Sequence, residues 1–114
     1  MNYSIKTTSS FDKEAKRLNK RYASFKDDLT SFISELKNNP ELGSDLGRGI
    51  RKIRMKIKSK CRGKSGGARI ITLNAIISEQ ESLIYLLFIY DKSERSTISS
   101  TEIDELIKQL TEFQ

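Results

Sequence analysis

The longest apolar run of the chain is Leu-Ile-Tyr-Leu-Leu-Phe-Ile-Tyr, from Leu83 to Tyr90. A strand with one face in solvent alternates apolar and polar residues, so a run that does not alternate is typical of a strand buried on both faces. We therefore expect a central β-strand at Ser82–Tyr90. The run is far too short to span a bilayer, and the polar start Met1–Ser4 lacks the hydrophobic region of a signal peptide, which predicts a cytoplasmic protein.

The segment Ser9–Asn38 is predicted to be a helical hairpin. Its capping signatures, Ser9–Asp12 and Ser24–Asp27, place a break near Tyr22, and Asn38–Pro40 ends the second helix. Apolar residues recur at spacings of four and three, which places them on one helical stripe: Phe11, Ala15, Leu18, Tyr22, Phe25, Leu29, Phe32 and Leu36.

Further strands and a final helix are expected around this hairpin. Asn2–Thr7 alternates apolar and polar residues, and Ala68–Ile77 is rich in β-branched residues. Ser78–Glu81 would join the latter to the central strand. Ser99 and Glu102 form a capping box at the start of a C-terminal helix.

This order of elements predicts a small α+β domain. An N-terminal strand and a helical hairpin pack on a mainly antiparallel sheet of three to four strands, followed by a C-terminal helix. A chain of 114 residues is long enough for one modest core and too short for two. A single domain is therefore expected over residues 1–114.

Positive charge is concentrated in one contiguous third of the chain. The 33 residues from Leu46 to Ser78 contain no Asp or Glu but ten Lys or Arg: Arg48, Arg51, Lys52, Arg54, Lys56, Lys58, Lys60, Arg62, Lys64 and Arg69. The other 11 basic residues are outnumbered by all 15 acidic ones, so the net charge of +6 arises from this stretch. Such a localised positive potential attracts polyanions, of which nucleic acid is the commonest.

Within this stretch, Arg51–Lys58 is predicted to be a strand with one cationic face. Its odd positions from Ile53 to Ile57 are apolar, so a pleated strand sends them to the core. The even positions supply four cations to the other face: Lys52, Arg54, Lys56 and Lys58. Loops are expected before and after this strand, at Gly43–Gly49 and Ser59–Gly67.

The chain has no histidine and a single cysteine, Cys61. This composition excludes Ser-His-Asp and Cys-His hydrolysis and nearly excludes the usual zinc sites, so neither a metal nor a cofactor is expected. Acid–base chemistry near neutral pH has to use Lys, Tyr, carboxylates or charge stabilised by Arg. One cysteine also agrees with a reducing compartment.

Three segments carry a resemblance to a known family: Arg51–Met55, Gly66–Ile71 with its Gly-Gly-Ala-Arg sequence, and Leu86–Glu94 with Tyr-Asp-Lys-Ser-Glu. Over essentially its whole length the chain resembles the RelE/HigB-like branch of the RelE/ParE toxin superfamily. The resemblance implies a toxin of a type II toxin–antitoxin system that enters the ribosomal A site, cleaves mRNA there and inhibits translation. It also implies a cognate antitoxin, expected to be a small helix-turn-helix protein encoded nearby, through which alone the toxin contacts operator DNA.

The implied endoribonuclease works without a metal, by attack of the RNA 2′-hydroxyl on the scissile phosphate. By the resemblance, Lys52, Arg54 and Arg69 bind and stabilise that phosphate, and Lys92 occupies a further catalytic position. Tyr90 is expected to pack at the rim of the sheet, with base stacking or proton transfer as its catalytic role. RNA or ribosome binding is expected of the other cations: Arg51, Lys56, Lys58, Lys60, Arg62 and Lys64.

The final turn departs from the family pattern. The chain has Ser93 where many RelE-like nucleases have Arg, and Ser99 near the position where many have Tyr. The sequence therefore assigns neither the general base nor the general acid.

Two other functional classes stay open. A ParE-like poison of DNA gyrase would share the fold and need no phosphodiesterase site, but the joint presence of Lys52, Arg54 and Arg69 favours the nuclease. A noncatalytic RNA- or ribosome-binding module would be indicated if the basic residues proved dispensable singly and merely additive, as backbone contacts usually are.

Overall fold

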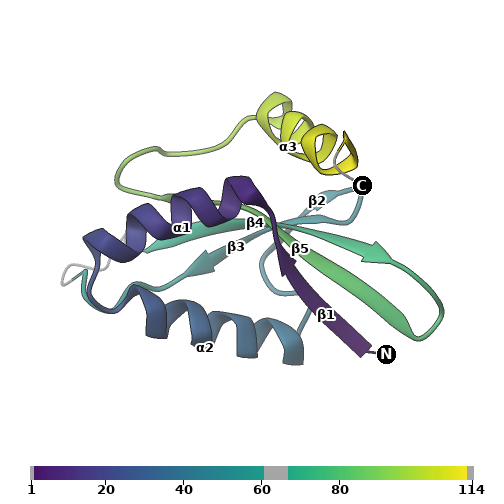
Figure 1. Cartoon of the computed structure of the whole chain (residues 1–114), viewed down its shortest axis with the longest axis horizontal. Coiled ribbons are helices and arrows are strands. Elements are labelled where there is room, and N and C mark those ends of the chain that lie inside the picture. The colour runs from purple at the N-terminus through teal and green to yellow at the C-terminus, as the bar shows by residue number, and fades with distance from the viewer. Residues whose placement is uncertain (1, 61–66, 113–114) are drawn as a thin grey trace.

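The structure, a computed structural model, describes residues 2–60 and 67–112. Its elements in chain order are β1 (Asn2–Thr7), α1 (Ser9–Arg21), α2 (Phe25–Asn38), β2 (Ser44–Gly47), β3 (Ile50–Met55), β4 (Ala68–Ile76), β5 (Glu81–Asp91) and α3 (Ser100–Glu112). The strands form one five-stranded sheet in the order β1-β5-β4-β3-β2, in which only β1 and β5 run parallel (Figure 1). The expected α+β class and mainly antiparallel sheet are confirmed.

The sheet has more strands than expected because β2 lies in the segment predicted to be a loop. Gly47 and Gly49 have positive φ values of 87° and 79°, and Arg48 between them has a φ of 58°, which reverses the chain tightly and lets β2 pair with β3. All four residues of β2 are exposed. Since only the backbone of β2 joins the sheet, no apolar alternation marks it in the sequence.

The helical hairpin is confirmed, with its break at Tyr22, between α1 and α2. The first cap is wrong by one residue: Thr8, not Ser9, caps α1, and its Oγ1 accepts the N–H of Phe11 at 3.2 Å. Ser24 precedes α2 but its side chain makes no capping hydrogen bond. The serines at the two expected caps therefore indicate where each helix begins, but they do not identify the side chain that makes a capping hydrogen bond.

The capping box of α3 is confirmed. The Glu102 carboxylate accepts the N–H of Ser99 at 3.1 Å, and the Ser99 hydroxyl accepts the N–H of Glu102 at 3.1 Å. Two backbone donors at the start of the helix are thereby satisfied.

Helices α1 and α2 cover one face of the sheet with the predicted apolar stripe. Phe11, Leu18 and Leu36 are essentially inaccessible and pack on inward residues of β3, β4 and β5. Burying an apolar side chain of this size is worth about 1.5–3 kcal/mol, so this cluster fixes both helices to the sheet.

Helix α3 covers part of the opposite face. Ile98, just before the helix, and Ile103 within it pack in a second cluster that includes Leu87. In β5, Leu86 belongs to the first cluster and Leu87 to the second. The prediction of an internal strand buried on both faces is therefore confirmed.

Strand β3 ends at Met55, whereas the expected strand ran to Lys58. Gly67, with a φ of 86°, brings its backbone so close to β3 that a Cβ atom there would lie 2.3 Å from the carbonyl oxygen of Met55, and β3–β4 pairing stops at this point. The alternation still continues, since Ile57 is buried and Lys56 and Lys58 are exposed. Lys56 and Lys58 thus add exposed positive charge past the end of the strand, at the pocket that also borders α2.

Across residues 2–60 and 67–112, no helix has both the length and the apolar character that crossing a membrane requires.

Candidate active site

The register of three strands brings three polar residues into one row. Arg54 of β3 is paired with Arg69 of β4, and Arg69 is paired with Tyr90 of β5. Directly opposed residues of neighbouring strands project to the same face, with Cβ atoms about 4.5–5.5 Å apart. We call this set the Arg54–Arg69–Tyr90 row.

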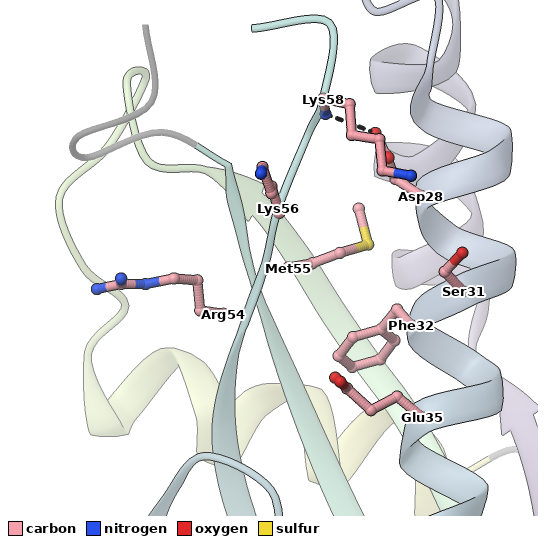
Figure 2. Close-up of a pocket in the computed structure, with 8 residues that line it drawn as sticks. All are labelled: Asp28, Ser31, Phe32, Glu35, Arg54, Met55, Lys56 and Lys58. Carbon is pink, nitrogen blue, oxygen red and sulfur yellow. Dashed lines mark hydrogen bonds between the residues drawn. The ribbon is translucent and has the colours of Figure 1, made fainter.

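The row lies on the face of the sheet opposite α1 and α2. Figure 2 shows Met55 and Phe32 filling the space between β3 and α2, while the side chain of Arg54 extends away from that space. The pocket there has a volume of about 140 Å³ and is bordered by Asp28 and Glu35 as well as by basic residues. Arg54 also borders this pocket, but its side chain extends away from these carboxylates and pairs with neither of them.

Within residues 2–60 and 67–112, no carboxylate neutralises the two arginines. Among the described residues, neither Arg54 nor Arg69 forms an ion pair. Burial lowers the pKa of Arg69, and the neighbouring charge of Arg54 lowers it further. Two like charges held side by side are stabilised by an anion that both can contact. A phosphate fits this requirement, because guanidinium groups bind phosphate oxygens in pairs.

Tyr90 ends the row with a buried hydroxyl. Its side chain is 3% exposed, and the hydroxyl has no hydrogen-bond partner among the described residues. Burial raises the pKa of Tyr90, while the charges of Arg69 and Arg95 offset only part of that effect, so the phenol is protonated at neutral pH. The expected position at the rim is wrong, since the ring is buried. A buried donor without a partner is costly to the folded state.

Arg95 covers the aromatic end of the row and was missed by sequence reasoning. Its guanidinium carbon lies 5.5 Å from the ring centroid of Tyr90 and 5.9 Å from that of Phe88. The same group donates to both carboxylate oxygens of Glu102, at 2.7 and 2.8 Å. Arg95 thereby ties the first turn of α3 to the row. Its only sequence signal is its place in the final turn, shortly before the capping box at Ser99.

Two lysines flank the row. Lys52 lies two residues from Arg54 on β3 and therefore shares its face. Lys92 follows β5 directly, and its ammonium group donates to the carbonyl of Ser96 at 2.6 Å. The backbone N–H of Lys92 donates to the carbonyl of Gly67 at 3.2 Å, which fixes this turn against the start of β4.

Two of the cations expected to bind RNA have internal partners instead. Arg51 donates to the backbone carbonyls of Leu42 and Gly43 at 2.8 and 2.9 Å. Lys60 lies 2.9 Å from the carboxylate of Asp91 and is itself only 14% exposed. Of the remaining cations, Lys56 and Lys58 are exposed, and Arg62 and Lys64 lie outside the described residues.

Asp91 joins three separate segments next to the row. Its carboxylate accepts hydrogen bonds from the Tyr22 hydroxyl, the Lys60 ammonium group, and both the backbone N–H and the hydroxyl of Ser93. Burial raises the pKa of Asp91, but the hydrogen bonds from Tyr22, Lys60 and Ser93 outweigh it and hold the pKa well below its usual range. We call this set the Asp91 anchor. Sequence reasoning missed it, although a lone carboxylate ending an apolar strand was an available signal.

No three His, Cys, Asp or Glu side chains gather into a metal-binding group in the part of the chain that the structure describes. The site is instead built from guanidinium, ammonium and phenol groups, which are donors to an anion.

A cationic row on the open part of a small α+β sheet is typical of a protein that binds a polyanion. The sequence model of the RelE toxin, described as the RelE toxin of the RelE/RelB toxin–antitoxin system, matches residues 5–114. The chain belongs to the RelE toxin family. Its membership gives it a cognate antitoxin as partner and confirms the resemblance to the RelE/ParE superfamily.

Proposed function

We propose that this RelE-family toxin is a ribosome-dependent endoribonuclease that cleaves mRNA in the A site and so inhibits translation. The Arg54–Arg69–Tyr90 row carries the proposal, because it combines two uncompensated cations with a protonated phenol on one face. The residues 1–114 act as one cytoplasmic domain in this proposal. The antitoxin is a small helix-turn-helix protein encoded nearby, through which operator DNA is reached.

In the proposed reaction, the 2′-oxygen forms a bond to phosphorus and the bond from phosphorus to the 5′-oxygen breaks. A proton leaves the 2′-hydroxyl, and a proton reaches the departing 5′-oxygen, so the products are a 2′,3′-cyclic phosphate and a 5′-hydroxyl. Arg54 and Arg69 stabilise the charge that grows on the phosphoryl oxygens. Preorganised donors of this kind usually contribute the largest catalytic effect, about 3 kcal/mol for each well-aimed group.

Tyr90 is suited to the donor side of this reaction. Because burial keeps its hydroxyl protonated, it can donate to the leaving oxygen or to a phosphoryl oxygen. Proton removal falls to Lys52 or Lys92. Lys52 is favoured, since it shares the face of Arg54, whereas Lys92 is already held by Ser96.

The ribosome supplies the positioning that this site lacks. The chain has no imidazole, so its acid–base contribution near neutral pH is weak. Holding the mRNA backbone in an attack geometry is worth several kcal/mol and can make up much of the deficit. The exposed cations Lys56 and Lys58, near the end of β3, are suited to contact ribosomal RNA.

The test compares cleavage of one mRNA, free and in a programmed 70S complex, at equal toxin concentration. Cuts inside the translated frame are expected only in the complex, mapped by primer extension, with cyclic-phosphate ends. Equal rates on free RNA would contradict ribosome dependence. Double-strand DNA breaks linked to gyrase, with intact mRNA, would support the ParE-like alternative, and ribosome binding without cuts would support a noncatalytic module.

A further inference from the structure

A second concave site lies on the same face as the row, between β2, β3 and the start of α3. It has a volume of about 270 Å³, and seven residues line it: Leu46, Arg48, Ile50, Lys52, Ile98, Ser100 and Ile103. Its floor is apolar, since Ile50, Ile98 and Ile103 are all buried. We call it the Leu46 groove.

The groove is continuous with the candidate active site through β3. Ile50, Lys52 and Arg54 are alternate residues of this strand and therefore share one face. Each step of two residues covers about 7 Å. Lys52 thus stands between the arginine pair and the groove, and an RNA strand held at Arg54 and Lys52 would continue toward Ile50.

The lining chemistry matches a nucleotide. Two of the seven lining residues, Arg48 and Lys52, are cationic and none is acidic. Arg48 is paired with Asp104 at 2.8 Å, but both side chains are more than half exposed, and such surface pairs are weak and readily exchanged for a phosphate. Apolar walls beside cations suit a flat base with an attached phosphate.

Leu46 gives the groove an exposed apolar wall. It is 44% exposed and is one of three large apolar side chains exposed within the described residues; the others are Ile76 and Ile77, near the turn between β4 and β5. The groove is smaller than the usual range of about 300–1,000 Å³ for sites of drug-sized ligands, which favours a single base over a larger group.

We propose that the Leu46 groove is a base-binding subsite, which receives the base next to the scissile phosphate and thereby sets the sequence preference of cleavage. This inference rests on the proposed function, since it needs an RNA strand at the Arg54–Arg69–Tyr90 row. Base identity is read by the apolar walls and the Ser100 hydroxyl, while Arg48 contacts the adjoining phosphate.

The test uses short oligoribonucleotides that carry a 2′-O-methyl group at the scissile position and so cannot be cut. Their affinity is measured by fluorescence anisotropy, with an intact base or an abasic nucleoside on either side of that position. In the wild-type protein, one of the two abasic positions should weaken binding about fivefold to tenfold, the low end of base-stacking effects, because the walls are aliphatic. The other position should have little effect.

Leu46→Glu should weaken binding of the intact oligonucleotide and remove the penalty for the abasic one. Ile77→Glu is the matched control, since Ile77 is 62% exposed and lies away from the groove; it should bind and discriminate as the wild type does. Equal thermal unfolding of the two variants would establish that both are folded. On programmed ribosomes, Leu46→Glu should flatten the base preference beside the cut sites.

The subsite is overturned if the wild-type protein binds intact and abasic oligonucleotides equally, or if Leu46→Glu still discriminates between them. It is also overturned if Leu46→Glu changes only the capture of the antitoxin, which would make the groove a protein contact. Failure of the proposed function has a different signature. Wild-type toxin would then make no cuts in programmed ribosomes, whatever the oligonucleotides show.

Discussion

On the α1/α2 side of the sheet, Lys60 meets the buried carboxylate of Asp91 at 2.9 Å, whereas on the opposite side Arg54 and Arg69 stand together without any acidic partner among the described residues. The paired charges join segments that are far apart in the sequence. The unpaired ones repel each other, and the Tyr90 hydroxyl in the same row has no hydrogen-bond partner among the described residues. Removing a member of the first set should therefore cost stability, and removing a member of the second should cost activity.

The largest effect is expected for Asp91→Ala. It leaves Lys60 and Tyr22 without their buried acceptor, and breaking a buried pair from one side costs about 3–5 kcal/mol. Urea denaturation measures the free energy of unfolding. Glu14→Ala is the control, because Glu14 pairs with Arg17 on the surface and should contribute at most about 1 kcal/mol. Similar losses for both variants would remove the distinction between the anchor and a surface pair.

Arg69→Ala should reduce activity and leave stability nearly unchanged. In single-turnover assays on programmed ribosomes with saturating toxin, the cleavage rate should fall about a hundredfold. This is the usual cost of losing a donor to the transition state. The free energy of unfolding should stay within about 0.5 kcal/mol of the wild type, because a repulsive neighbour of Arg54 is removed. Lys26→Ala, an exposed cation on α2, serves as control and should cut normally. An unchanged rate for Arg69→Ala would rule out its catalytic role.

Acid should weaken the anchor before it affects the arginine row. The folded-state pKa of Asp91 is lowered, so its contribution to stability is complete above the unfolded pKa near 3.9 and is lost as pH falls below that value. Between about pH 4 and pH 2, stability should fall more steeply in the wild type than in Asp91→Asn, by up to about 1.4 kcal/mol per pH unit. Urea denaturation at several pH values measures the two slopes. Parallel slopes would contradict the assignment.

Tyr90→Phe should separate the effect on stability from the effect on activity at a single residue. Removing a buried hydroxyl that has no partner should leave stability unchanged or raise it by about 1 kcal/mol, while cleavage should slow about tenfold through loss of the donor. Thermal unfolding and single-turnover cleavage of the same preparation make the comparison. A destabilised variant with normal cleavage would identify Tyr90 as a core residue only.

Lys58→Ala is expected to have the smallest effect. Loss of this exposed side chain should weaken ribosome association a fewfold and lower the slope of log affinity against log salt by about 1. The cleavage rate at saturating toxin should not change. Association at several salt concentrations tests this. A large fall in the saturated rate would move Lys58 from the binding set to the catalytic one.

Local pattern was sufficient for most elements. The alternation at Ile53, Met55 and Ile57, the reciprocal cap at Ser99, and the unbroken run in β5 each follow from short-range chemistry, because side-chain periodicity and capping depend on residues only a few positions apart. The concentration of charge in residues 46–78 was equally visible. These features predict the α+β class and a cationic face from the sequence alone.

The tertiary structure decides which cations have internal partners and which are available to bind an anion. The sequence placed Lys60 and Arg51 in one basic set with Arg54, yet only chain packing brings Asp91 to Lys60 and the Leu42 carbonyl to Arg51. Strand β2 was not predicted for a related reason. Its pairing uses backbone groups, and its four exposed residues show no apolar alternation in the sequence. The adjacency of Arg54, Arg69 and Tyr90 depends on the register of three strands, which long-range hydrogen bonds determine. Residue type and spacing thus determined the elements and the sign of the charge, whereas the register and the buried partners determined where that charge can act.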